Sequence, residues 1–145
     1  DNCLTVACAE SCTGGMLASR LTSISGSSMY IKGSIVTYSN EAKMKFLDVD
    51  KEILDTKRAV SPEVAKQMAE GVRKVVGSDI GVGITGIAGP TGGTDKKPVG
   101  LVYIAVAGKD NIVVKENIFS GDRARVRYRS TQQALEMIRQ YINNK

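Results

Sequence analysis

Ser11 and Thr13 are the residues whose type and position could do chemistry, and both lie in the small-residue run Ala9-Glu10-Ser11-Cys12-Thr13-Gly14-Gly15. The run follows a short apolar segment, residues 4–8, and precedes a helical pattern, so both hydroxyls are expected at a strand-to-helix turn. Backbone N–H groups without helical partners gather at such a turn and favour anions or developing negative charge. Ser11 could therefore act as a nucleophile. The alternative is that Ser11 or Thr13 only caps the helix, and spacing alone favours that alternative.

The absence of histidine limits what could activate a serine nucleophile. With no imidazole in the chain, the general base has to be a lysine amine or a carboxylate. An unperturbed lysine has a pKa of about 10.4, so it accepts a proton near neutrality only if it is partly buried or close to another cation. The residue pattern alone does not select which amine or carboxylate would serve.

A second glycine-rich stretch, residues 83–94, has the composition of a loop. Its first part, Gly83-Ile84-Thr85-Gly86-Ile87-Ala88-Gly89-Pro90, superficially looks like a phosphate-binding loop. It lacks the Gly-Lys-Ser/Thr ending of a P-loop and the strand–G-x-G-x-x-G–helix context of a dinucleotide fold. Taken alone, the stretch is equally well explained as a structural turn.

Alternating strand and helix patterns surround these motifs. Short apolar or β-branched runs predict strands at residues 4–8, 30–38, 80–84, 101–107 and 112–118, the last two as an antiparallel hairpin. Helical spacing of apolar residues predicts helices at residues 16–24, 41–47, 50–56 and 62–76, and a long closing helix with its apolar face in residues 131–142. The start of the fourth helix is marked by a capping Ser61 followed by Pro62, and its end by Gly77.

This order of elements predicts one domain over residues 1–145, a three-layer α/β/α sandwich with a mixed, mostly parallel sheet. Three of the predicted strands end in polar or glycine-rich segments, at residues 10–15, 39–40 and 85–93. Ligands of open α/β sheets bind beyond the carboxyl ends of the strands. If these ends converge, they make one pocket.

Composition excludes several other classes of protein. No apolar run approaches the roughly 20 residues of a membrane span, so we expect no membrane association. Three cysteines (Cys3, Cys8 and Cys12) with no framework spacing are typical of reduced thiols in a cytoplasmic protein. Without histidine or a C-x-x-C spacing they predict no metal site. A net charge of +5 with 5% aromatic residues suits a phosphorylated small molecule as well as nucleic acid, but leaves little material for stacking bases.

Four motifs, in this order along the chain, together carry a family resemblance. They are the run at residues 9–15, the segment Tyr38-Ser39-Asn40-Glu41-Ala42-Lys43, the loop at residues 83–90, and Gly121-Asp122-Arg123 continuing to Arg127. In this combination the chain resembles the CinA C-terminal domain family over nearly its whole length. That family includes the nicotinamide mononucleotide deamidases (PncC), which hydrolyse the carboxamide of the nucleotide to ammonia and nicotinate mononucleotide. The N-terminal molybdopterin-binding-like domain of full-length CinA proteins is not in this sequence, which begins almost at the family's first strand.

The resemblance implies a Ser–Lys mechanism. Ser11 matches the serine of the family's AESCTGG-type motif, the expected nucleophile, and Lys43 matches the lysine expected to be its base. Backbone N–H groups at the turn of residues 13–15, or at Thr85-Gly86, would stabilise the oxyanion. No metal or cofactor is required. Without the resemblance, a solvated helix residue is the better interpretation of Lys43.

The remaining candidate site residues are those expected to bind the nucleotide. Arg123 and Arg127 lie at i, i+4 on one helix face and match the family's Gly-Asp-Arg-x-x-x-Arg positions, whereas Arg125 and Arg129 are expected on a solvated face. Glu10 could orient a substrate hydroxyl or pair with a lysine, and Tyr38 could face the pocket or the core. The full substrate-binding set is Glu10, Thr13, Gly14, Gly15, Asn40, Thr85, Gly86, Gly89, Arg123 and Arg127.

Two other functions compete with the amidohydrolase. The first is a non-catalytic nucleotide-binding or interaction domain of a competence- or damage-inducible CinA-like protein, which would keep the motifs for structural reasons. The second, weaker one is nucleic-acid binding through residues 123–129, which would depend steeply on salt. For the domain itself we expect self-association into a homo-oligomer.

Overall fold

A computed structural model describes residues 3–144 of the chain. In chain order its elements are β1 (Val6–Glu10), α1 (Met16–Thr22), a short 3₁₀ helix η1 (Ser27–Met29), β2 (Ile31–Val36), α2 (Asn40–Leu47), α3 (Lys51–Lys57), α4 (Pro62–Val76), β3 (Ile80–Gly86), β4 (Leu101–Ala107), β5 (Ile112–Ile118) and α5 (Arg123–Asn143).

The strands form one mixed sheet with the order β2-β1-β3-β4-β5. β1 runs parallel to both of its neighbours, β2 and β3, whereas β4 runs antiparallel to β3 and β5 antiparallel to β4. Only β4 therefore points against the others, which confirms a mixed, mostly parallel sheet and the predicted hairpin. The chain moves from β1 to β2 on one side and then to β3 on the other, so a switch point lies between β1 and β3.

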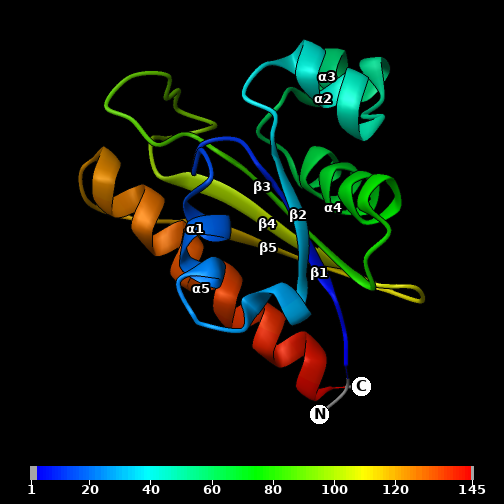
Figure 1. Ribbon diagram of the computed structural model, residues 1–145. Helices are drawn as coiled ribbons and strands as arrows, with labels where there is room; N and C mark the ends of the chain where they lie inside the picture. Colours follow the sequence, from blue (N-terminus) through cyan, green and yellow to red (C-terminus); the bar gives the residue numbers. More distant parts are fainter. Residues whose placement is uncertain (1–2, 145) are drawn as a thin grey trace.

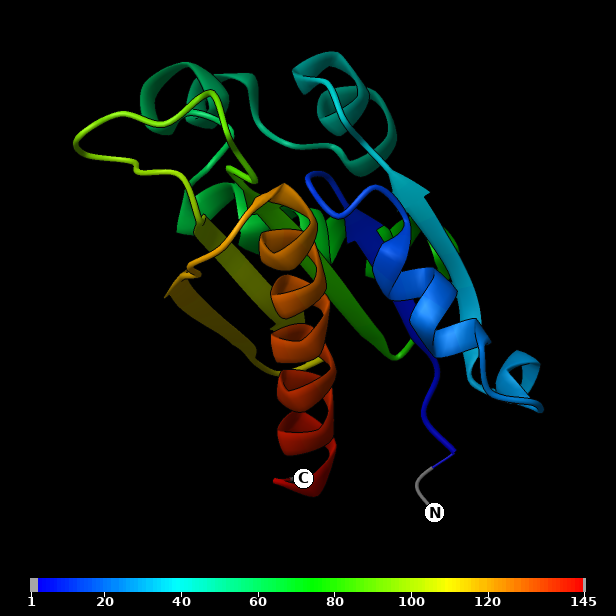
Figure 2. The same cartoon turned by 90° about the vertical axis from the view of Figure 1, so that its left-hand side faces the viewer.

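Helices cover both faces of the sheet, as predicted for three layers. α1 and α5 lie against one face (Figure 1), where Leu17, Val126 and Ala134 pack in one buried cluster with Cys8, Val82 and other strand residues. α4 covers the other face, and α2 and α3 pack on α4 rather than on the strands. Figure 2 shows the loop that follows β3 arching over the same end of the sheet as α2, α3 and the first turn of α5.

Glycines in β3 let α4 lie directly on the sheet. A Cβ atom on Gly81 would collide with the backbone carbonyl of Ala69, and one on Gly83 with that of Ala65. Both carbonyls belong to α4, so the close approach that alternating glycines predict is made by this helix.

Several element boundaries differ from the predictions. The first strand is Val6–Glu10 rather than residues 4–8, because Ala9 and Glu10 continue the ladders with both neighbouring strands. α1 ends at Thr22 instead of continuing to residue 24, because side-chain hydroxyls bond to the last backbone carbonyls of the helix. The Thr22 hydroxyl donates to the carbonyl of Ala18, and the Ser23 hydroxyl donates to that of Arg20. β2 is shorter than predicted at both ends.

Among the described residues, no helix is both long enough and apolar enough to cross a bilayer. The longest helix, α5, has 21 residues, and its sequence carries charged residues along its whole length.

Candidate active site

The carboxyl ends of β1, β2 and β3 meet at a cavity of about 280 Å³. This confirms that the three strand-end segments converge. The lining of the cavity comes from the turn after β1, from the segment before α2 and from α2 itself, from the segment between α3 and α4, from the end of β3 and the loop after it, and from α5. The lining residues are Ser11, Cys12, Tyr38, Asn40, Lys43, Ala59, Val60, Thr85, Gly86, Ile87, Ala88, Gly89, Thr91, Gly92 and Arg123.

Ser11 and Lys43 meet at the base of this cavity. The Nζ atom of Lys43 lies 3.0 Å from the Oγ atom of Ser11 and donates a second hydrogen bond to the backbone carbonyl of Thr37, at 2.6 Å. The side chain of Lys43 is only 1% exposed and Ser11 is 9% exposed. The solvated alternative for Lys43 is therefore wrong.

Burial changes the acid–base behaviour of this amine. Desolvation lowers the pKa of Lys43 from its ordinary value of 10.5 to about 8, and the effect of the nearby Cys12 thiol in the opposite direction is smaller. Among the described residues, the Nζ atom of Lys43 is hydrogen-bonded only to the Ser11 hydroxyl and the Thr37 carbonyl, so no carboxylate stabilises its charge. The amine is thus poised to exchange a proton near neutral pH.

The local sequence explains why Lys43 points inward. Ser39 caps α2 by accepting a hydrogen bond from the Ala42 backbone N–H, which fixes the first turn of the helix. Lys43 lies one turn into α2, and Leu47, at i+4 on the same face, is also buried. The neighbouring Lys45 is exposed, as the helical period requires.

The main chain of Ser11 is held in the turn between β1 and α1, but Ser11 does not cap the helix. The N-cap residue of α1 is Gly15, and no side chain of the cap residue accepts a hydrogen bond. The alternative in which Ser11 or Thr13 caps the helix is therefore wrong. Ser11 donates its backbone N–H to the carbonyl of Ile84 and accepts from the N–H of Gly14, so its main chain is tied to β3 as well as to the turn.

Glu10 takes over the capping role from inside the sheet. Its fully buried carboxylate accepts hydrogen bonds from the Thr13 hydroxyl at 2.6 Å and from the backbone N–H groups of Leu17 and Ala18 at 2.9 and 3.0 Å. A carboxylate at the positive end of a helix is favoured electrostatically as well. Both earlier interpretations of Glu10, a substrate hydroxyl partner and a lysine partner, are replaced by this one, and neither Glu10 nor Thr13 lines the cavity.

The two arginines at the start of α5 occupy different places. Arg123 lines the cavity and joins two of its walls, donating to the Gly89 carbonyl at 2.8 Å and to the Tyr38 hydroxyl at 2.9 Å. Arg127 does not line the cavity. It donates to the carbonyls of Cys12 and Thr13, so it braces the turn that carries Ser11.

The other sequence-predicted residues divide in the same way. Asn40, Thr85, Gly86 and Gly89 all line the cavity, and the Thr85 hydroxyl donates to the Ala59 carbonyl at 2.8 Å. Gly14 and Gly15 do not line it. Their left-handed φ angles, 59° and 101°, instead shape the turn, as glycine readily permits.

Sequence reasoning missed one wall of the cavity. Ala59 and Val60, in the segment between α3 and α4, line the cavity beside Thr85. Nothing in these two residue types signals chemistry, and they lie outside the four motifs that carry the family resemblance. Cys12, also in the lining, has a pKa raised by burial to about 11, which makes its thiol a poor nucleophile.

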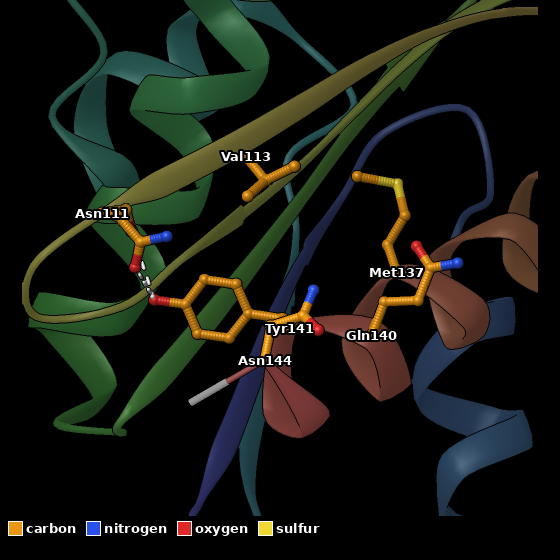
Figure 3. A pocket seen from close by; sticks show the side chains of 6 residues that line it. All are labelled: Asn111, Val113, Met137, Gln140, Tyr141 and Asn144. Carbon is orange, nitrogen blue, oxygen red and sulfur yellow. Dashed lines mark hydrogen bonds between the residues drawn. The ribbon is translucent and has the colours of Figure 1, made fainter.

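A second pocket, of about 170 Å³, lies between the end of α5 and the β4–β5 hairpin (Figure 3). It contains Met137, Val113 and the Tyr141 ring, whose hydroxyl contacts Asn111. Because Ala107, at the end of β4, pairs with Gly81 near the start of β3, this pocket is at the opposite end of the sheet from Ser11. Among residues 3–144, no group of three or more His, Cys, Asp or Glu side chains could hold a metal ion.

Comparison with known proteins places the chain within a family. The model of the CinA C-terminal domain matches residues 1–142. A CinA-like protein of Koribacter versatilis is 55% identical over 138 residues, which cover 95% of this chain and 33% of that protein. The chain spans about a third of the length of the curated relatives it matches.

Solved structures agree with this placement. The crystal structure of the competence/damage inducible protein CihA from Agrobacterium tumefaciens superposes with a TM-score of 0.92 at 43% identity, covering 94% of this chain and 84% of that one. A competence-damaged protein (CinA) superfamily protein from Escherichia coli gives a TM-score of 0.93 at 36% identity, over 97% of this chain and 81% of that one.

Proposed function

The chain belongs to the CinA C-terminal domain family, and from this premise we propose that it is an amidohydrolase that hydrolyses the carboxamide of nicotinamide mononucleotide. Ser11 is the nucleophile and Lys43 its general base. The products are nicotinate mononucleotide and ammonia. The observation that carries this proposal is the buried 3.0 Å contact between Lys43 Nζ and Ser11 Oγ, made by an amine with a lowered pKa.

The reaction divides into two proton-balanced halves. In the first, the neutral amine of Lys43 takes the Ser11 hydroxyl proton while Oγ attacks the carboxamide carbon. The resulting ammonium then gives that proton to the leaving nitrogen, the C–N bond breaks, and ammonia leaves an ester on Ser11. In the second, Lys43 takes a proton from water, the hydroxide attacks the ester, and the proton returns to Ser11 as the acid is released.

The Thr37 carbonyl has a role in this cycle. It accepts a hydrogen bond from Nζ in a direction different from that of Ser11, so it holds the amine in place through each change of partner. A carbonyl oxygen also stabilises the ammonium form that exists between the two transfers.

Removing a single group that stabilises the oxyanion typically costs about 100- to 1000-fold in rate, so the backbone N–H groups beside Ser11 would matter comparably.

Arg123 is the residue we assign to the substrate phosphate. It is the arginine in the cavity lining, and its guanidinium forms a fork suited to phosphate oxygens. Its present partners, a glycine carbonyl and a phenol hydroxyl, are neutral, so an anionic phosphate would compete well for the same donors. Arg127, held by the Ser11 turn, is assigned to the turn and not to the phosphate.

A direct assay tests this function. Purified protein is incubated with nicotinamide mononucleotide, and ammonia and the acid product are both quantified. Ser11→Ala and Lys43→Ala should each lower kcat at least about a thousandfold, as removal of a nucleophile or its base does elsewhere. Ser19→Ala, on the exposed side of α1, is the matched control and should keep wild-type turnover.

The non-catalytic alternative makes a different prediction for the same sample. If the nucleotide raises the melting temperature of the wild type but neither product accumulates at micromolar enzyme, the chain is a binding domain and the amidohydrolase proposal fails. A large loss of stability in Ser11→Ala would also contradict the nucleophile role, because it would reveal a structural one.

A further inference from the structure

The cavity wall formed by residues 58–60 has a conformation that needs external support. α3 ends at Lys57, and the next residue, Arg58, has a φ of 69° and a ψ of 171°, a region that residues with side chains rarely adopt. Three residues later Ser61 caps the start of α4. Ala59 and Val60, which line the cavity, therefore lie between the end of α3 and the start of α4 and belong to neither helix.

Four backbone carbonyls of this stretch, from Lys57 to Val60, are all occupied by side-chain donors. The Ser61 hydroxyl donates to the Arg58 carbonyl at 2.9 Å, and the Thr85 hydroxyl to that of Ala59 at 2.8 Å. The other two carbonyls, of Lys57 and Val60, each accept from the Nζ atom of Lys97 at 2.7 Å. One ammonium thus holds both ends of the wall.

Lys97 is well suited to this contact. The Lys57 carbonyl belongs to the last turn of α3, where unpaired carbonyls and the negative end of the helix dipole favour a cation. The half-buried ammonium makes charge-assisted hydrogen bonds there. Burial lowers the pKa of Lys97; the charge of Glu63 opposes this lowering in part, and Arg58 adds a smaller lowering.

The backbone around Lys97 is itself fixed. Thr94 and Lys97 close a turn with two hydrogen bonds, from the Thr94 N–H to the Lys97 carbonyl and from the Lys97 N–H to the Thr94 hydroxyl. Two residues later Val99 packs against Gly89 and Gly93, where there is no room for a Cβ atom. Lys97 therefore connects the glycine-rich loop, which forms one side of the cavity, to the wall formed by Ala59 and Val60.

We propose that Lys97 is a positioning residue of the active site, which sets the width of the substrate cavity by fixing the Ala59–Val60 wall to the glycine-rich loop. Its ammonium is hydrogen-bonded to the Lys57 and Val60 carbonyls and to neither Ser11 nor Lys43, so it acts on substrate binding and not on proton transfer. The expected change in KM rests on the proposed amidohydrolase function, whereas the expected change in hydrogen exchange does not.

The test compares Lys97→Met with Lys96→Met, which removes the same charge from the exposed neighbouring position. In Lys97→Met we expect KM for nicotinamide mononucleotide to rise about tenfold or more while kcat stays within about threefold of wild type. Backbone hydrogen exchange at residues 58–61 should accelerate in the free protein. Lys96→Met should change neither quantity, and Lys97→Arg, which keeps a charged donor, should recover part of the KM.

If a folded Lys97→Met has the KM and the hydrogen exchange of the wild type, the proposal is overturned. It is also overturned if kcat falls about tenfold while KM does not change. If Lys97→Met does not fold, Thr94→Ala replaces it, because this variant removes only the hydroxyl that holds the Lys97 backbone in an exposed turn. Faster exchange at residues 58–61 together with a raised KM would support the role of Lys97. If both exchange and KM stay at their wild-type values, the role is rejected. If the wild type does not turn over the nucleotide, the amidohydrolase fails, and the exchange measurement alone decides on Lys97.

Discussion

At the scale of single residues, the proposed mechanism makes both rate and stability depend on the protonation of Lys43. With a pKa lowered to about 8, only about a tenth of the enzyme carries the neutral amine at pH 7. We expect kcat/KM to rise about tenfold per pH unit below pH 8 and to level off above it. A rate that is flat between pH 6 and 8 would contradict Lys43 as the base, and Lys43→Arg, which stays protonated, should be inactive throughout.

The same lowered pKa predicts the sign of a stability change. The unfolded chain binds the Lys43 proton more tightly than the folded one, so the cost of burying the charge is complete below pH 8 and disappears as pH rises to about 10.5. The free energy of unfolding of Lys43→Met, relative to wild type, should therefore be larger at pH 7 than at pH 9.5 by about 2 kcal/mol. Urea denaturation at both pH values measures it, and a difference of the opposite sign would show that the amine is not desolvated.

At the scale of elements, the buried Glu10 carboxylate joins β1 to α1. Glu10→Gln keeps the shape but offers one acceptor oxygen where the carboxylate offers two, so one of the N–H groups of Leu17 or Ala18 would face an amide NH₂. A buried donor left without a partner costs about 1–3 kcal/mol. Chemical denaturation should show this loss, together with reduced turnover because α1 follows the Ser11 turn. Glu41→Gln, in the exposed first turn of α2, is the control. It should leave turnover unchanged and should lose less stability than Glu10→Gln, because an exposed acid at a helix N-terminus contributes only about 0.3–1 kcal/mol.

The contact between β3 and α4 gives a second test at this scale. Gly83→Ala would place a methyl group against the Ala65 carbonyl and the Ala69 backbone nitrogen, so the helix would have to move away from the sheet. We expect a loss of about 1–3 kcal/mol, the usual cost of overpacking. Gly33→Ala on β2 is the matched control, because its new methyl would meet only the methyls of Val76, at 3.4 and 3.6 Å. Equal losses in the two variants would argue against a special role of the β3 glycines.

At the scale of the whole molecule, α5 connects two ends with different tasks. Its first turns carry Arg123 and Arg127 to the cavity and to the Ser11 turn, whereas near its other end Tyr141 donates to the Asn111 side chain at 2.7 Å. Tyr141→Phe should lower the melting temperature by about 3 °C for a loss of about 1 kcal/mol. Because the lost bond lies at the far end of the sheet, KM and kcat should not change; a change in KM would show that the two ends are coupled.

Local pattern predicted the elements well because helix and strand signals are short-range. The cap at Ser61, the proline at residue 62 and the glycine at residue 77 set the limits of α4 through contacts a few residues long. Boundaries failed where the end of an element depends on a distant partner: β1 reaches Glu10 because β2 and β3 continue beside it. Ser11 and Lys43 could be named because their motifs are distinctive, even though 32 residues separate them.

By itself, then, the sequence determined the α/β/α layering, the absence of an imidazole base and the chemical types available at three strand ends. Only the tertiary structure decided which of those side chains face the cavity. It showed that Glu10 and Arg127 hydrogen-bond to the segment around the Ser11 turn instead of lining the cavity. It also placed Ala59 and Val60 in the cavity wall and Lys97 against that wall, although all three lie outside the family motifs. The physical reason is that burial and hydrogen-bond partners depend on neighbours remote in the chain, and the desolvation that brings the pKa of Lys43 towards neutrality exists only once those neighbours have assembled around it.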